Sequence, residues 1–208
     1  MSNVLILTSS ALGEASVSSK LAHQFGERLQ AREPSASIVT RDVGIDPLPH
    51  LTAETVGGIR GAAKTEAEKA AATLSDVLIA EIAAADLIVI GSPMYNFGIS
   101  STLKAWFDHV LRAGITFRYT EAGPEGLMTG KRAIVIESRA GLYSEGPAAA
   151  MDGQEPHLRT MLGFMGIDDV EFIRAERLAF GPDAADESVA AAARRLAAIA
   201  SEGLALAA

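Results

Sequence analysis

Three short segments of the chain carry residues whose types and spacing suit ligand chemistry. The first, residues 9–18, is rich in serine and joins an aliphatic run to a helical pattern that begins near Ser18. Hydroxyl groups and free backbone N–H groups at the start of a helix bind anions such as phosphate. A plain helix cap at Ser16 or Ser18 also fits this pattern. The length of the segment and its place after the first apolar run favour a phosphate site.

The second segment, residues 93–98, has the composition of a binding surface. Turns usually favour small polar residues, but here three large side chains surround one amide: Met94, Tyr95 and Phe97 around Asn96. This suits a flat apolar ligand with one polar edge, which Asn96 and backbone groups would hydrogen-bond while the aromatic rings wall the cavity. The alternative is that Tyr95 and Phe97 fold back into the core.

The third segment, residues 138–141, contains Ser138, Ala140 and Gly141, whose small side chains let the backbone approach a ligand closely. Two further connections, residues 43–64 and 114–129, exceed the usual length of a loop. We therefore expect them to serve function or partner contact.

The three segments follow apolar runs that we expect to be strands. Residues 4–7, 87–90 and 133–136 are short and almost continuously aliphatic, as strands covered on both faces are. Residues 37–40 and 170–173 give weaker strand patterns. Helical patterns alternate with these strands, at residues 19–31, 65–84, 101–112, 157–165 and 187–199.

This alternation predicts a doubly wound α/β fold with five parallel strands and helices on both faces. In open sheets of this kind, ligands bind beyond the carboxyl ends of the strands, near the point where the strand order reverses. The three segments follow the first, third and fourth strands, so we expect them to meet at one edge of the sheet.

The composition argues against several classes of protein. Cysteine is absent, so disulfides, thiolate chemistry and cysteine-based metal sites are excluded. The net charge is −8 and the basic residues are scattered, which argues against nucleic-acid binding. The 4 histidines lie far apart and form no metal-ligand pattern. With no run of membrane-spanning length and no signal-peptide pattern, we expect one cytoplasmic domain over residues 1–208.

Together the three segments resemble the family of FMN-dependent NADH:azoreductases, whose members also reduce quinones. The resemblance covers nearly the whole chain. It includes the spacing of Ser10 from Ser16-Val17-Ser18 and runs through ADLIVIGSPMYNF at residues 85–97. It is strongest over RAGITFRYTEAGPEGLMTGK at residues 112–131, a stretch far more specific than any short motif.

The resemblance implies a flavodoxin-like sheet that binds FMN, and it assigns roles by position. The FMN phosphate would be held by Ser10, Ser16, Val17 and Ser18. One edge of the isoalloxazine would be lined by Pro93, Met94, Tyr95, Asn96 and Phe97, and its pyrimidine side by Ser138, Arg139, Ala140 and Gly141. The substrate pocket would include Arg60, Tyr119 and Phe164. No side chain is expected to act as an obligatory catalytic acid or base.

The implied activity is a two-electron, ping-pong transfer from NADH through FMN to quinones or azo compounds. The implied assembly is a homodimer with the active site at its interface, for which we expect Trp106, Phe107 and residues 114–129 to provide contacts. The alternatives are a flavodoxin-type electron carrier and a related FMN-dependent NAD(P)H flavin reductase. The sequence leaves open the physiological acceptor and the choice between NADH and NADPH.

Two features depart from the family pattern. Ala140 stands where the family commonly has glycine, and a positive φ there would strain the backbone near the pyrimidine edge of the flavin. Residues 142–154 are longer than usual, so we expect a shifted substrate preference.

Overall fold

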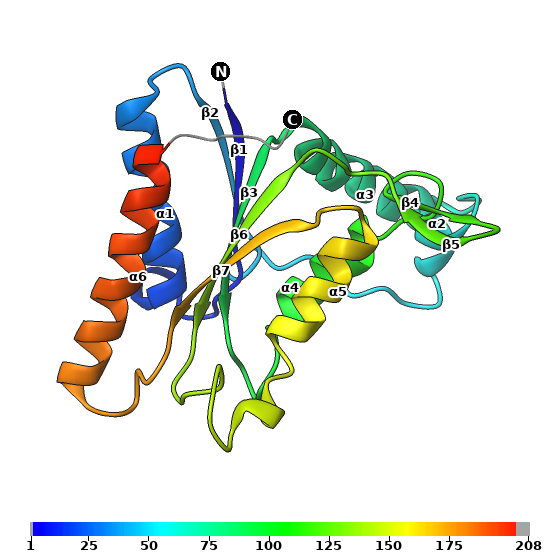
Figure 1. The fold of residues 1–208 in the computed structure, drawn as a ribbon. Coiled ribbons are helices and arrows are strands. Elements are labelled where there is room, and N and C mark those ends of the chain that lie inside the picture. The colour runs from blue at the N-terminus through cyan, green and yellow to red at the C-terminus, as the bar shows by residue number, and fades with distance from the viewer. Residues whose placement is uncertain (1, 203–208) are drawn as a thin grey trace.

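The computed structural model describes residues 2–202, apart from the side chain of Glu14, and forms a parallel sheet with helices on both faces (Figure 1). The strands of the sheet are β1 (Asn3–Thr8), β2 (Ser37–Asp42), β3 (Leu87–Pro93), β6 (Arg132–Ser138) and β7 (Asp169–Ala175). Their order is β2-β1-β3-β6-β7, and all neighbours are parallel. This is the flavodoxin-like order, so the predicted fold class is confirmed.

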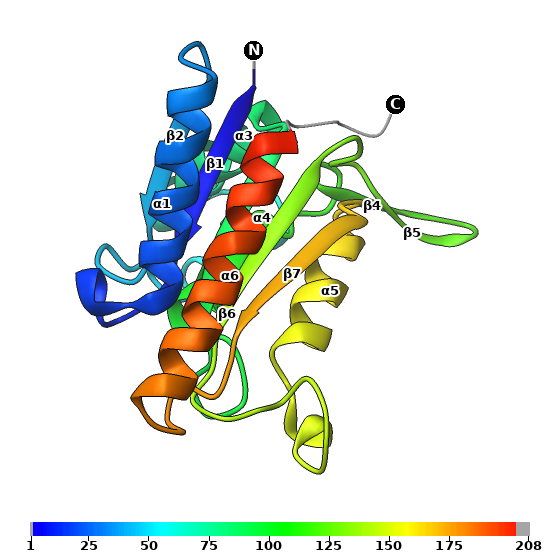
Figure 2. The ribbon, with the colours of Figure 1, turned by 60° about the vertical axis from the view of Figure 1, so that its left-hand side comes forward.

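Two hydrophobic layers cover the sheet. The helices α1 (Val17–Arg32) and α6 (Pro182–Glu202) lie side by side on one face, and α3 (Glu66–Ala84), α4 (Ser101–Val110) and α5 (Glu155–Phe164) lie on the other (Figures 1 and 2). Alternate residues of β1 supply both layers, because side chains along a strand point to opposite faces. Val4 and Ile6 pack under α1 and α6, whereas Leu5 and Leu7 pack under the other helices.

The two long connections contain structure that the sequence pattern did not predict. The first holds the short helix α2 (Val56–Arg60), and the second holds an antiparallel hairpin of β4 (Phe117–Thr120) and β5 (Gly123–Gly126). One of the two glycines in α2 has a clear packing reason, because a Cβ on Gly58 would lie 2.1 Å from the carbonyl oxygen of Glu68. Single 3₁₀ turns, η1 (Gly13–Ala15) and η2 (Ala149–Met151), lie in the loops after β1 and β6.

The sheet positions the predicted site through the direction of its strands. Because β1, β3 and β6 are parallel, their carboxyl ends and the loops that follow them lie at the same edge (Figure 2). The β4–β5 hairpin projects from the body of the molecule near the opposite edge in both views. The fold therefore separates the three loops from the hairpin.

Candidate functional site

The loop after β1 presents an open helix start. Ser16 caps α1, since its Oγ accepts a hydrogen bond from the N–H of Ser19 at 3.2 Å, and it lies 3.2 Å from the hydroxyl of Ser18. The N–H groups of Val17 and Ser18 have no acceptor within the described residues. Unpaired N–H groups at the positive end of a helix form an anion site. A helix cap at Ser16 and a phosphate site at the start of α1 are therefore compatible in this loop.

The loop after β3 is a strained turn. Tyr95 and Gly98 pair through N–H···O bonds of 2.9 and 3.1 Å, and the two residues between them, Asn96 and Phe97, have φ of 47° and 72°. Positive φ at a bulky residue such as Phe97 is unfavourable and is typical of functional loops. Their N–H groups have no acceptor within the described residues. The turn thus presents two unpaired donors.

The side chains of this loop do not enter the core. Phe97 is 43% exposed, and Met94 and Tyr95 are half-buried, so the alternative of a core position for Phe97 is wrong. The Tyr95 hydroxyl instead crosses to the first loop, where it lies 3.2 Å from Ser10 Oγ and accepts from the N–H of Ala11 at 3.1 Å. Tyr95 therefore joins the first two loops.

The loop after β6 is held at its carbonyl oxygens. Those of Ala140 and Gly141 accept from the N–H groups of Ala179 and Arg177 at 3.0 and 2.9 Å. Their own N–H groups have no acceptor in the described part of the chain. Ala140 has no positive φ, so the strain expected from the missing glycine does not arise.

Contacts between the loops bring the predicted cofactor residues to one edge. The N–H of Met94, which follows the buried Pro93, donates to the Ser138 carbonyl at 2.9 Å. The rings of Phe97 and Tyr143 meet edge to face with centroids 6.0 Å apart. The 142–154 segment therefore packs against the second loop. An anion site at one end and carbonyl-binding N–H groups at the other fit a cofactor that joins a phosphate to a flat polar ring, as FMN does.

The predicted substrate residues lie elsewhere in the same chain. Tyr119 on β4 and Phe164 at the end of α5 both pack against Phe117, with ring centroids 5.5 and 4.5 Å apart. Arg60 is exposed at the end of α2. None of the three contacts the loops through a hydrogen bond or ring contact within residues 2–202.

Two expected interface residues are placed differently from the prediction. Trp106 and Phe107 of α4 are each 0% exposed, and their rings pack edge to face in the core between α4 and the sheet. They cannot contact a second chain, because α4 presents both of them to the sheet. Of the expected interface material, the hairpin remains available.

The sequence pattern did not predict a buried group of charged side chains near the three loops, at the carboxyl end of β6. Glu137 and Arg139 are both 0% exposed, with Arg139 Nη2 2.7 Å from Glu137 Oε2. Burial raises the pKa of the Glu137 carboxyl to about 7, although the charge of Arg139 opposes this. The signal was the spacing of two across the end of β6, because alternate residues of an extended chain point to the same side. Within the described residues no group of three or more His, Asp or Glu side chains is placed to hold a metal.

Replacing Glu137 with glutamine is expected to flatten the pH dependence of stability. The folded state holds the proton more tightly than the unfolded state, whose pKa is near 4.5, so stability falls as pH rises from there to about 7. The loss from this carboxyl is up to about 3 kcal/mol. Chemical denaturation of the wild type and of Glu137→Gln, at about pH 5 and about pH 8, measures how the free energy of unfolding changes with pH. Glu66→Gln, at an exposed site on α3, is the control. If the free energy of unfolding changed equally with pH in Glu137→Gln and in the wild type, the raised pKa of Glu137 would be contradicted.

Comparisons with known proteins agree with this geometry. A model of a family with flavodoxin-like fold matches residues 2–200. A Hyphomonas neptunium protein named FMN-dependent NADH:quinone oxidoreductase is 51% identical over 200 residues, covering 96% of each chain. One of the same name from Agrobacterium fabrum is 50% identical over 194 residues, covering 92% of this chain and 95% of the relative.

Solved structures give the same picture. An azoreductase from Bacillus anthracis str. Sterne superposes with a TM-score of 0.88 at 30% identity, covering 98% of this chain and all of the other. An FMN-dependent NADH-azoreductase from Bacillus anthracis str. Ames Ancestor, solved in complex with FMN, gives 0.87 at 25% identity, covering 97% and 99%.

Proposed function

The chain belongs to the family of FMN-dependent NADH:quinone oxidoreductases, which has a flavodoxin-like fold, and from this premise we propose that it reduces quinones with NADH through bound FMN. Azo compounds are proposed as further acceptors, since azoreductases are its structural neighbours. The observation that carries the proposal is the set of unpaired N–H groups that three loops bring to one edge of the sheet. NADH and the acceptor would use the same place in turn, in a ping-pong scheme.

The chain's own residues bind and orient the cofactor, whereas bound FMN supplies the chemistry of accepting a hydride and passing on two electrons. The start of α1 holds the phosphate through the N–H groups of Val17 and Ser18 and the hydroxyls of Ser10 and Ser16. Because the net charge is −8, the backbone donors and the helix dipole must provide most of this attraction.

The other two loops hold the ring. The unpaired N–H groups of Asn96 and Phe97 would hydrogen-bond one polar edge of the ring, and those of Ala140 and Gly141 would hydrogen-bond its pyrimidine side. Donors placed in advance where negative charge develops lower the barrier to electron transfer. The remaining ring contacts would come from Pro93, Met94, Tyr95 and Ser138, whereas the Arg139 side chain is buried behind this loop.

We further propose a homodimer in which a second copy completes the pocket. Tyr119 is 73% exposed on the projecting hairpin (Figure 2) and, like Phe164, makes no ring contact with the three loops of its own chain. Two-fold pairing would bring the hairpin of one chain to the loops of its partner. In this arrangement Tyr119 and Phe164 shape the acceptor pocket and Arg60 contacts the nicotinamide nucleotide.

A cytoplasmic location and a single domain over residues 1–208 complete the proposal. No helix in the described part of the chain is long and apolar enough to cross a membrane. A supply of NADH supports the cytoplasm as the place of reaction.

Steady-state kinetics with three acceptors test the proposed function. A quinone, an azo dye and free FMN would each be varied against NADH. We expect turnover with the quinone and the azo dye, and parallel double-reciprocal lines, as a ping-pong scheme requires. Intersecting lines would contradict the shared site. Efficient turnover with free FMN alone would indicate a flavin reductase.

A further inference from the structure

One guanidinium group lies behind the loops of the proposed flavin site. The Arg139 side chain is 0% exposed, which is rare for arginine. Its backbone N–H donates to the carbonyl of Ala175 at 2.9 Å, and its carbonyl accepts from the N–H of Leu178 at 3.2 Å. The backbone N–H of Arg139 is therefore already paired, and its side chain is shielded from solvent.

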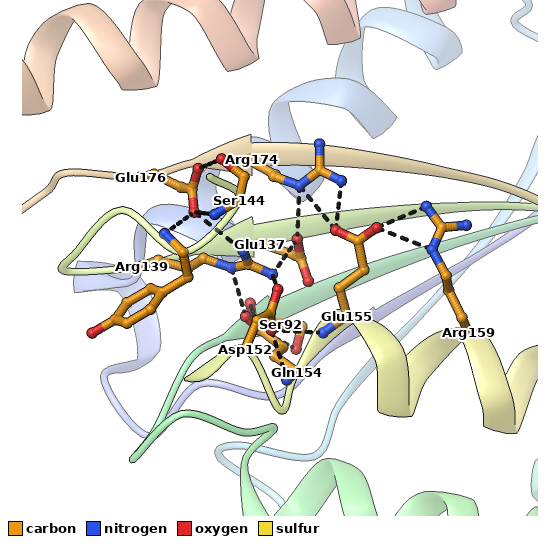
Figure 3. Close-up of polar contacts among 11 residues, drawn as sticks. Ser92, Glu137, Arg139, Ser144, Asp152, Gln154, Glu155, Arg159, Arg174 and Glu176 are labelled. Atoms are coloured by element: carbon orange, nitrogen blue, oxygen red, sulfur yellow. Dashed lines mark hydrogen bonds and ion pairs between the residues drawn. The ribbon is translucent and has the colours of Figure 1, made fainter. Parts of the chain in front are cut away.

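The guanidinium contacts four side chains (Figure 3). Nε donates to Gln154 Oε1 at 2.9 Å, and Nη1 donates to Glu176 Oε1 at 3.1 Å. Nη2 lies 2.7 Å from Glu137 Oε2 and 3.0 Å from Asp152 Oδ2. These partners come from β6, from the segment before α5 and from the connection after β7. One planar group therefore joins three parts of the chain that are far apart in sequence.

Two of these partners extend the network to neighbouring loops. Gln154 Nε2 donates to the carbonyl and hydroxyl oxygens of Ser92, at the end of β3, at 2.8 and 3.0 Å. Glu176 Oε1 accepts from the N–H groups of Tyr143 and Ser144 at 2.8 and 3.0 Å. Through these contacts Arg139 is linked to the strand that leads into the second loop. Networks of this kind are rigid only when every member is present.

The proposal follows from the place of Arg139 beside the unpaired donors. On the basis of the proposed function, we propose that Arg139 is a positioning residue whose buried guanidinium holds the N–H groups of Ala140 and Gly141 in the arrangement that receives the flavin ring. Donors held in place before binding lose little freedom when the ligand arrives. Lysine keeps the charge but lacks the planar fork, so it cannot keep all four contacts.

The test compares Arg139→Lys with Arg159→Lys. Arg159 is the matched control, because its side chain is 52% exposed and pairs with Glu155 on its own helix. Two readouts on the apoprotein are the Kd for FMN, from flavin fluorescence, and hydrogen exchange over residues 138–144. For Arg139→Lys we expect affinity to fall, and exchange to accelerate, at least about tenfold. Changes in the control should stay within about twofold.

Riboflavin separates a defect at the ring end of the site from a defect at the phosphate end. It lacks the phosphate, so a defect at the ring end should weaken riboflavin and FMN by the same factor. If Arg139→Lys fails to fold, Gln154→Leu removes one neutral contact of the guanidinium and should weaken both ligands by at least about threefold.

The outcomes distinguish this inference from the proposed function. A lower melting temperature for Arg139→Lys, with FMN affinity and loop exchange equal to those of Arg159→Lys, would overturn the positioning role alone. A wild-type chain that binds neither FMN nor riboflavin would overturn the proposed function and this inference with it.

Discussion

Replacing Ser16 with aspartate is expected to weaken FMN binding at least about 100-fold while leaving the fold intact. Ser16 caps α1 through its bond to the N–H of Ser19, and aspartate caps a helix as well as serine does. A carboxylate is also favourable at the positive end of a helix, so stability should change by less than about 1 kcal/mol. A phosphate about 5 Å away would be repelled by about 3 kcal/mol per charge at an effective dielectric constant of about 20.

Titration of apoprotein with FMN measures this loss, and denaturation measures stability. Thr65→Asp is the matched control, because Thr65 caps α3 through the N–H of Glu68 and is exposed. It should bind FMN like wild type. If Ser16→Asp bound FMN as tightly as the wild type, the proposal that the phosphate binds at the start of α1 would be contradicted.

Mixing two defective variants is expected to restore turnover, because each proposed active site uses two chains. Ser16→Asp should lack FMN, and Tyr119→Ala should hold FMN but lose at least about tenfold in kcat/KM for quinone. In a mixed dimer, the loops of the Tyr119→Ala chain meet the intact hairpin of the other chain. After random exchange about half of the dimers are mixed, and each regains one intact site.

Activity of the mixture should therefore exceed that of either variant alone at equal concentration of chains. Sedimentation of the wild-type chain provides the independent check. A fully active monomer, or a mixture that shows only the average of its components, would contradict the shared site.

The sheet could be predicted because its inner strands are covered by helices on both faces. Residues 87–90 and 133–136 are aliphatic throughout and 0% exposed, so burial on both faces is visible in the sequence itself. Helix ends were less certain. Two helices begin earlier than their apolar patterns suggested, near Pro156 and at Pro182, since proline suits the first turn of a helix.

The β4–β5 hairpin and the Arg139 network were beyond sequence reasoning for different reasons. The hairpin is short and mostly exposed, so no alternation of apolar residues marks it. Arginine is rarely buried, so a buried arginine is not expected from the sequence. The partners of Arg139 range from Glu137 to Glu176 along the chain, and only the folded structure shows that they lie together. Trp106 was expected at an interface because exposed and buried tryptophan look alike in a sequence.

The most direct test is the absorption spectrum of the purified, FMN-loaded chain before and after anaerobic addition of NADH. The visible flavin band should bleach rapidly with about one equivalent of NADH and return when a quinone is added. A chain that binds FMN but keeps its yellow colour in excess NADH would be an electron carrier of the flavodoxin type, and that result would contradict the proposed oxidoreductase.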